Sequence, residues 1–310
     1  MIIKEIFGSE YNIMSIEPLL GGAQKHTYIA KCKNGFSFVI YCWGKNTTYF
    51  ENNSNSNIFR SSGSELFKLN NLLIREKHIL TPEMYYMNQS REELDYEYAF
   101  VEYISGVDMD YIMMKEQDRI PLVIKSLEDN ISKLHSIKSD KIGQLGNMQD
   151  KDFDLLQYIL MEVQDNCNFL LEYDREYKEE YIRAINEVMD IANNIKKRST
   201  YTFIHAELGP NHVIVDKNNQ AYLIDIEGAR FCDAEEEDSF IKFRFQNLVS
   251  TQNNGIETDR MKLYHLAHCF GILRGAIELK NINYYDMDDV NEMINFFHSQ
   301  FLKKNSDNKG

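Results

Sequence analysis

The segment that decides the fold reads HAELGPNHVIVD over residues 205–216 and continues, after a short polar turn, as LIDIEGARFCD over residues 223–233. Each piece contains a short apolar run typical of a strand, and Asn218-Asn219 between them is typical of a turn. Two antiparallel strands joined by such a turn bring their outer ends together. The sequence therefore predicts a short hairpin whose flanking polar residues meet at one end.

Four of these flanking residues are candidates for chemistry. His205, Glu207 and His212 precede the first strand, and Asp225 ends the second. Converging carboxylates and imidazoles can bind a divalent cation and orient a hydroxyl group, which suits phosphoryl transfer because that reaction depends mostly on positioning and charge neutralisation. Taken singly, the residues also have simpler interpretations. His205 fits a buried core histidine, and Asp225 fits an aspartate that starts a turn.

The rest of the chain divides into a β-rich beginning and a helical remainder. Residues 13–43 contain apolar runs separated by Asn34-Gly35, a strong hairpin signal. Further periodicities predict a strand over 96–105 and helices over 61–76, 121–137, 176–197, 258–279 and 287–302. We therefore predict an α+β protein with a β-rich N-lobe over residues 1–104 and a mainly helical C-lobe over residues 105–310 that carries the inserted hairpin.

Composition limits the classes of partner. The chain has 310 residues, 43% of them hydrophobic, and a net charge of −14, which argues against nucleic acid as a ligand and is compatible with a cationic small molecule. No apolar run reaches the length of a membrane span, and the N-terminus lacks the layout of a secretion signal. Five scattered cysteines favour reduced thiols. We expect a cytoplasmic protein with no membrane and no nucleic-acid partner.

The quoted segments resemble the catalytic loop and the metal-binding segment of the aminoglycoside phosphotransferase and choline kinase-like family, whose pattern is His-x-Asp, a turn with proline, Asn, a strand and an Ile-Asp pair. The resemblance extends to LLGGAQKHTYIAKC at 19–32, FVIYCW at 38–43 and AFVEYISG at 99–106, which are similar to the glycine-containing loop, the third strand and the hinge. It implies a two-lobed protein-kinase-like fold.

The resemblance also implies an activity: transfer of a phosphoryl group from ATP or GTP, with Mg²⁺ or Mn²⁺, to a hydroxyl of a small cationic molecule such as an aminoglycoside-like antibiotic or an amino alcohol. The implied roles are nucleotide binding by Gly21, Gly22, Glu65, Glu102 and Ile104, catalysis by Glu207 with His205, metal binding by His212 and Asp225, and support of the catalytic loop by Glu237.

The sequence departs from the family pattern at three positions. Glu207 replaces the usual aspartate and has a longer side chain, and His212 replaces asparagine as a metal ligand. This combination resembles a variant subgroup of the family that carries the same glutamate and histidine. Tyr41 stands on the third strand, where a basic residue is expected to pair with the helical glutamate.

Tyr41 leaves the third strand without the expected basic side chain, which leaves alternatives open for the phosphate contact and for the function. Lys25 or Lys45 is an alternative contact for the phosphates, and Tyr41 itself would then pack against Glu65. The alternative function is a kinase-like binding protein without phosphotransfer. A protein kinase fits less well, because no activation segment follows Asp225.

An acidic block, DAEEED, occupies residues 233–238. Acidic side chains are favourable near the positive N-terminal end of a helix, so we interpret the block as a solvated helix start. The alternative is an acidic rim that attracts a polyamine-like acceptor.

Overall fold

In the computed structural model of the chain, the described residues are 2–19, 25–44, 59, 63–92, 94–250, 257–284 and 287–302. They belong to two compact units, the first comprising Met1–Asp150, Thr200–Glu237 and Ile241–Asn253, and the second Lys151–Ser199, Asp238–Phe240 and Asn254–Gly310. The lobe boundary at residue 104 stays a prediction, since the units divide the chain along a different line.

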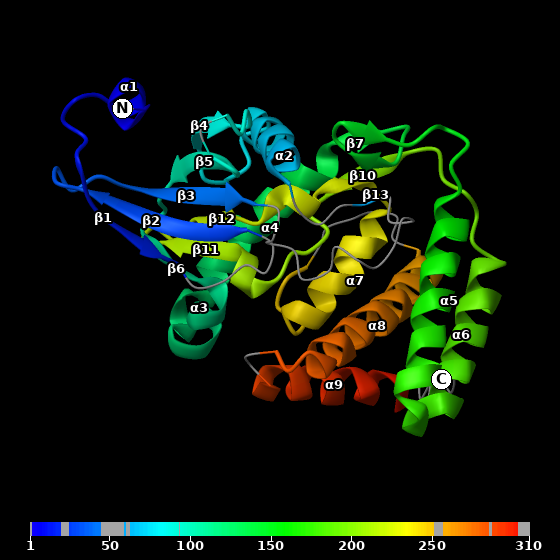
Figure 1. The fold of residues 1–310 in the computed structure, drawn as a ribbon. Helices are drawn as coiled ribbons and strands as arrows, with labels where there is room; N and C mark the ends of the chain where they lie inside the picture. The colour runs from blue at the N-terminus through cyan, green and yellow to red at the C-terminus, as the bar shows by residue number, and fades with distance from the viewer. Residues whose placement is uncertain are drawn as a thin grey trace. The chain divides into compact units, whose positions relative to one another are not determined.

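The first unit begins with an antiparallel sheet in the order β1-β2-β3-β5-β4 (Figure 1). Its strands are β1 (Ile13–Pro18), β2 (His26–Cys32), β3 (Ser37–Trp43), β4 (Met84–Asn88) and β5 (Glu97–Glu102). Gly35 has a φ of 86° in the turn between β2 and β3, a conformation that glycine adopts without strain. The predicted Asn-Gly hairpin is confirmed.

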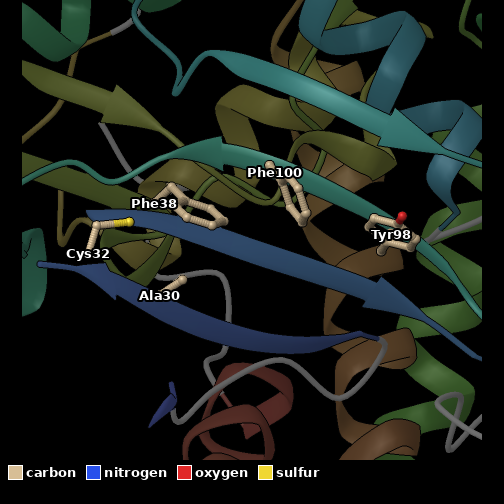
Figure 2. Packing of buried hydrophobic residues seen from close by; sticks show 5 residues of the cluster. All are labelled: Ala30, Cys32, Phe38, Tyr98 and Phe100. Carbon is tan, nitrogen blue, oxygen red and sulfur yellow. The ribbon is translucent and has the colours of Figure 1, made fainter. Parts of the chain in front are cut away.

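The two faces of this sheet pack against different elements. On one face, the cluster in Figure 2 contains Ala30, Cys32, Phe38, Tyr98 and Phe100, and it is covered by apolar residues of helix α1 (Ile2–Phe7). Side chains alternate along a strand, so Tyr41 points to the other face. There its ring meets Phe67 of helix α2 (Ser64–Glu76) edge-on at 5.3 Å. This second face is the one that approaches the polar residues of the hairpin.

The remainder of the first unit carries that hairpin on short strands and helices. These elements are β6 (Gly106–Asp108), α3 (Met109–Lys115), η1 (Gln117–Arg119), α4 (Ile120–Ser136), β7 (Lys138–Ser139), β8 (Gly143–Gln144), β9 (Asn147–Met148), β10 (Tyr201–Ile204), η3 (Pro210–His212), β11 (Val213–Asp216), β12 (Ala221–Leu223), η4 (Ile226–Gly228) and β13 (Arg230–Cys232), followed by α7 (Ala234–Arg244). The strands form two further sheets, β12-β11-β6 and β7-β10-β13-β8-β9.

One close approach fixes the segment after the hinge onto the hairpin. Gly106 at the start of β6 pairs with Asp216 of β11. A Cβ added at Gly106 would lie 2.1 Å from the carbonyl oxygen of Val215, so only glycine fits there. The chain that follows β5 is therefore held directly against the hairpin that carries the candidate site.

The second unit is built from helices. They are α5 (Leu155–Tyr173), α6 (Lys178–Ala192), α8 (Thr258–Asn281) and α9 (Met287–Leu302), joined by the short η2 (Arg175–Tyr177); α5 and α6 lie side by side (Figure 1). The helices predicted over 176–197, 258–279 and 287–302 are confirmed as α6, α8 and α9, while α5 was not predicted. Among the described residues, no helix combines the length and apolarity that crossing a membrane requires.

Candidate active site

The hairpin brings the predicted polar residues together. Val213 of β11 pairs with Leu223 of β12, and the N–H of Ile224 donates to the carbonyl oxygen of His212 at 3.0 Å. The residues outside these pairs therefore meet, and Nε2 of His212 lies 3.4 Å from Oδ2 of Asp225. The convergence predicted from the turn and strand pattern is confirmed.

The arrangement of His212 fits a cation ligand. Its Nδ1 lies 2.7 Å from the carbonyl oxygen of Glu207, which can only accept, so the ring proton is assigned to Nδ1. Burial lowers the pKa of the His212 imidazole, which favours the neutral ring. The lone pair of Nε2 then faces a carboxylate oxygen of Asp225. Two electron-pair donors facing one another suit a cation bound to both.

The protein groups supply only part of a metal's ligand set. In the part of the chain that the structure describes, no group of three or more His, Cys, Asp or Glu side chains is arranged to hold a metal ion. Mg²⁺ usually takes one or two protein ligands and completes its shell with water and phosphate oxygens. His212 and Asp225 therefore fit a metal that arrives with a nucleotide.

Asp225 has a strained backbone and an ionised side chain. Its φ of 57° and ψ of 47° lie in the left-handed region, which non-glycine residues occupy rarely and mostly where the surroundings enforce it. Burial alone would raise the pKa of its carboxyl group, but the Lys25 ammonium, which donates to Oδ1, lowers that pKa well below its ordinary value. Asp225 thus presents a permanent negative charge at the end of β12.

Glu207 presents a carboxylate that is available to accept a proton. Its Oε1 lies 3.6 Å from the position that a Cβ on Gly228 would take. Burial, and next the charge of Asp225, raise the pKa of Glu207 to about 7. Within the described ranges, no hydrogen bond to this carboxylate is recorded. A group with these properties can act as a general base near neutral pH.

His205 holds the loop rather than facing the space beside Glu207. Its side chain is 1% exposed, and its Nε2 lies 2.9 Å from the carbonyl oxygen of Ile224. This bond joins the loop that contains Glu207 to the residue before Asp225. The geometry gives His205 a positioning contact through Nε2, while its buried Nδ1 has no hydrogen-bond partner among the described residues, so the interpretation of a satisfied core histidine holds for one ring nitrogen.

Glu237 supports the same loop from α7. Its Oε1 accepts the backbone N–H groups of His205 at 2.7 Å and Ala206 at 3.1 Å, and its Oε2 lies 2.5 Å from Nε2 of His135. Ala206 has a φ of 75°, so the loop is strained at this point. This is the loop-supporting contact that the family resemblance implied for Glu237.

The acidic block begins a helix, but it is not solvated. Helix α7 starts at Ala234, yet Asp233, Glu235 and Glu237 are only 2%, 1% and 0% exposed. Part of the block faces inward because Glu237 binds the catalytic loop and Glu236 pairs with Arg230. The predicted helix start is confirmed, and the predicted solvation is wrong. Carboxylates this deeply buried do not form a surface rim either.

The lysine near the site lies just before the second strand. Lys25 directly precedes β2, is 8% exposed, and places Nζ 2.6 Å from Oε1 of Glu227 while also donating to Asp225. The ammonium lies 5.0 Å from the centre of the Tyr41 ring. Glu65 of α2 is exposed, and no ion pair joins it to another described residue. Tyr41 packs against Phe67, so the predicted Tyr41–Glu65 contact is wrong.

The nucleotide-binding positions are only partly described. Gly21, Gly22 and Lys45 lie outside the described residues. The N–H of Glu102 donates to the carbonyl oxygen of Glu83 at 2.7 Å. Ile104 follows β5, and its backbone makes no hydrogen bond to another described residue, so its N–H and C=O groups are open to a ligand.

Sequence analysis missed Asn70, Arg244 and Glu227 as contributors to the site. Nδ2 of the buried Asn70 donates to the carbonyl oxygen of Ile226 at 2.7 Å, and Arg244 donates to Oδ1 of Asn211 at 2.6 Å. An asparagine on the apolar side of a helix is the signal that could have indicated Asn70, since a buried amide requires partners. No comparable pattern marks Arg244.

An antiparallel sheet, a set of helices and a hairpin with Glu207 before its first strand and the strained Asp225 after its second are features of a kinase-like phosphotransferase. Residues 68–237 match the phosphotransferase enzyme family (APH), more than half of the chain. The chain therefore belongs to this family and is an enzyme of the small-molecule phosphotransferase class. This membership favours phosphotransfer over the alternative of a binding protein.

Solved structures confirm the kinase-like fold. A thermostable mutant of aminoglycoside phosphotransferase APH(4)-Ia, in a complex with ADP and hygromycin B, is 14% identical with a TM-score of 0.64 and 98% of each chain covered. Choline kinase LicA from Streptococcus pneumoniae is 16% identical with a TM-score of 0.59, covering 97% of this chain and 98% of LicA. Spectinomycin phosphotransferase APH(9)-Ia, with ADP and spectinomycin, is 11% identical with a TM-score of 0.62, covering 96% and 92%. No curated protein matches the sequence itself.

Proposed function

We propose that the chain transfers the terminal phosphoryl group of ATP or GTP to a hydroxyl of a small cationic molecule, with Glu207 as general base. The acceptor oxygen forms a bond to phosphorus while its proton passes to Glu207. The bond between phosphorus and the bridging oxygen breaks, and the nucleoside diphosphate leaves with that electron pair. The observation that carries the proposal is the position of Glu207, whose carboxylate has no hydrogen-bond partner among the described residues and whose carbonyl oxygen holds His212 beside Asp225.

The proposed metal ligands are Oδ2 of Asp225 and Nε2 of His212. Support comes from their 3.4 Å separation and from the proton assignment that turns the His212 lone pair toward Asp225. A bound Mg²⁺ or Mn²⁺ would neutralise phosphate charge. Mg²⁺ prefers oxygen ligands and Mn²⁺ would tolerate the imidazole nitrogen, so both ions are candidates for this site.

Nucleotide binding is proposed for the hinge and the glycine-containing loop. The unpaired backbone groups of Ile104, together with Glu102, would hydrogen-bond the purine, and Gly21 and Gly22 would cover the phosphates. Structures of similar fold were crystallised with ADP or AMP-PNP, which supports a nucleotide cofactor here. The resemblance also implied a nucleotide contact for Glu65, but its exposure on α2 does not support one.

A cationic acceptor is favoured by charge and by analogy. The chain carries a net charge of −14, which attracts cations and opposes nucleic acids. Similar structures hold hygromycin B or spectinomycin, and another is a choline kinase. We propose an amine-bearing hydroxyl compound, used in the cytoplasm without a membrane partner.

The test is a thermal-shift series with ATP and GTP, each with Mg²⁺ and Mn²⁺, on the wild type and on Asp225→Ala. We expect a metal-dependent nucleotide shift in the wild type that is lost in the variant. Diphosphate release is then measured with hygromycin B, spectinomycin and choline as acceptor probes. Nucleotide binding that is indifferent to Asp225→Ala, with no turnover on any probe, would overturn the proposal.

A further inference from the structure

The face of the sheet where a basic residue is expected carries Tyr41 instead, and Lys25 fills that place. Thr27 of β2 pairs with Tyr41 of β3, so Lys25, two residues before Thr27, enters the same side of the sheet. Its ammonium lies 5.0 Å from the centre of the Tyr41 ring, a favourable distance for a cation over an aromatic face. Lys25, directly before the neighbouring strand β2, thus replaces the basic residue that was expected on β3.

Two carboxylates hold this ammonium. Lys25 donates to Oε1 of Glu227 at 2.6 Å and to Oδ1 of Asp225. Glu227 is 1% exposed and Lys25 is 8% exposed. The Glu227 carboxylate would be costly to bury alone, and the hydrogen-bonded ammonium of Lys25 offsets that cost. The lysine is therefore fixed beside the aspartate proposed as a metal ligand.

Glu227 takes the place of the helical glutamate as the partner of the lysine. Glu65 on α2 is exposed and has no recorded ion pair to another described residue, whereas Phe67 of the same helix faces Tyr41. The second oxygen of Glu227, Oε2, is buried and has no hydrogen-bond partner among the described residues. Because Oε1 of Glu227 binds Lys25 independently of Asp225, Glu227 would still hold Lys25 if Asp225 bound another cation.

We propose that Lys25 contacts the phosphates of the bound nucleotide and that Glu227 is the residue that positions it. This inference rests on the proposed function, since it concerns the nucleotide of that reaction. A lysine ammonium carries three donors, and its bonds to Glu227 and Asp225 use two of them, so a further donor would reach a phosphate oxygen of a nucleotide bound beside Asp225. The lysine–glutamate pair of this chain thus comes from the start of β2 and from η4.

The experiment compares the affinity for a triphosphate with the affinity for its nucleoside, by calorimetry with MgCl₂. ATP and adenosine, and GTP and guanosine, are titrated into the wild type, Lys25→Ala and Glu227→Gln. A charge-assisted bond to a phosphate corresponds to about a tenfold to hundredfold change in affinity. We expect Lys25→Ala to weaken triphosphate binding by about that factor and to leave nucleoside binding unchanged, and Glu227→Gln to weaken it less.

Two further variants separate binding from folding. Lys25→Ala removes the partner of the buried Glu227 carboxylate, so the charge-matched double variant Lys25→Met/Glu227→Gln provides a folded background with the same expected loss. Lys25→Ala/Tyr41→Lys returns a lysine to β3, and we expect it to regain triphosphate affinity. Lys31→Ala is the matched control, because Lys31 lies on the strand that Lys25 precedes, pairs with Glu17 and has a side chain that is 41% exposed.

The outcomes are distinct. Equal triphosphate affinity in the wild type and in Lys25→Ala overturns this inference and leaves the proposed function intact. An equal loss for triphosphate and nucleoside also overturns it, because the lysine would then only support the shape of the pocket. A wild-type protein that binds neither triphosphate overturns the proposed function itself. Selective loss of triphosphate affinity, with recovery by Tyr41→Lys, establishes the role of Lys25.

Discussion

The carboxylate of Glu237 holds Ala206 in a left-handed conformation. It accepts the N–H of Ala206 at 3.1 Å, and Ala206 has a φ of 75°. A strained backbone persists only where its surroundings enforce it, and here one side chain from α7 provides that enforcement. The position of Glu207, which follows Ala206, therefore depends on a residue 30 positions further along the chain.

Replacing Glu237 by alanine should destabilise the protein strongly. The variant removes the acceptor of two loop amides and leaves His135 without its buried carboxylate partner. We expect a loss of about 3–5 kcal/mol in the free energy of unfolding, measured by urea denaturation. Glu76→Ala is the control, because Glu76 is exposed and pairs, among the described residues, only with its neighbour Lys77, and it should change stability by less than about 0.5 kcal/mol. Similar losses in the two variants would contradict the assigned support.

Stability should fall in acid partly through Glu237. Burial alone would raise its pKa, but the hydrogen bond and charge of His135 lower it below the ordinary value of 4.5. The unfolded chain therefore takes up a proton at Glu237 before the folded protein does, so this contribution is complete above pH 4.5 and declines below it. Urea denaturation at several pH values should show the gap between wild type and Glu237→Gln narrowing below pH 4.5. A gap independent of pH would refute the assignment.

Glu207→Gln should block proton transfer without blocking nucleotide binding. Loss of a general base lowers turnover by about a hundredfold to ten-thousandfold. Metal-dependent nucleotide hydrolysis should fall by that factor, while the nucleotide thermal shift remains. Glu207→Asp keeps the carboxylate on a shorter side chain and should retain part of the activity. Unchanged hydrolysis in Glu207→Gln would remove Glu207 from the catalytic role.

His212→Asn should change the preference between metals. Replacing an imidazole nitrogen by an amide oxygen favours Mg²⁺ over Mn²⁺. The ratio of activities with Mn²⁺ and Mg²⁺ should fall in the variant. His78→Asn is a suitable control, because His78 is exposed and its φ of 55° is one that asparagine tolerates. The idea fails if both variants keep the wild-type ratio.

Gly106→Ala should separate β6 from β11. The added Cβ would lie 2.1 Å from the carbonyl oxygen of Val215, and backbone cannot yield as a flexible side chain can. We expect a loss of about 3 kcal/mol or more in the free energy of unfolding. Gly275→Ala in α8 meets no atom within 4 Å and should stabilise the protein by up to about 1 kcal/mol. A tolerated Gly106→Ala would show that the two strands can part at little cost.

The sequence allowed the convergence of Glu207, His212 and Asp225 to be predicted, because a short turn fixes which strand ends meet. It did not reveal that Lys25 pairs with Glu227. That contact spans 202 positions and depends on how the entry to β2 is oriented over the Tyr41 ring. The sequence predicted a contact between Glu65 and Tyr41 because Glu65 lies near the start of a helix. In the structure, the register of α2 turns Phe67 toward Tyr41 instead.

The acidic block shows a second limit of sequence reasoning. Composition predicts that consecutive acids face water, since burying a charge without a partner is costly. Arg230, His135 and the loop amides supply partners to Glu236 and Glu237, and none of these is adjacent in sequence to the residue it binds. Partners brought in by the tertiary fold are what a local pattern omits.

The side-chain amide of Asn70 links helix α2 to the segment after Asp225. It reaches the carbonyl oxygens of Ile226 at 2.7 Å, Glu227 at 3.3 Å and Ala229 at 3.4 Å. This link between α2 and the segment after Asp225 is made by a neutral donor on backbone oxygens, whereas the salt bridge that the family resemblance implied for this helix was to the third strand. Added salt weakens interactions between exposed charges but has little effect on a buried neutral hydrogen bond. The alignment of the helix with the metal-binding segment should therefore persist across ionic strengths that would loosen an ion-paired helix.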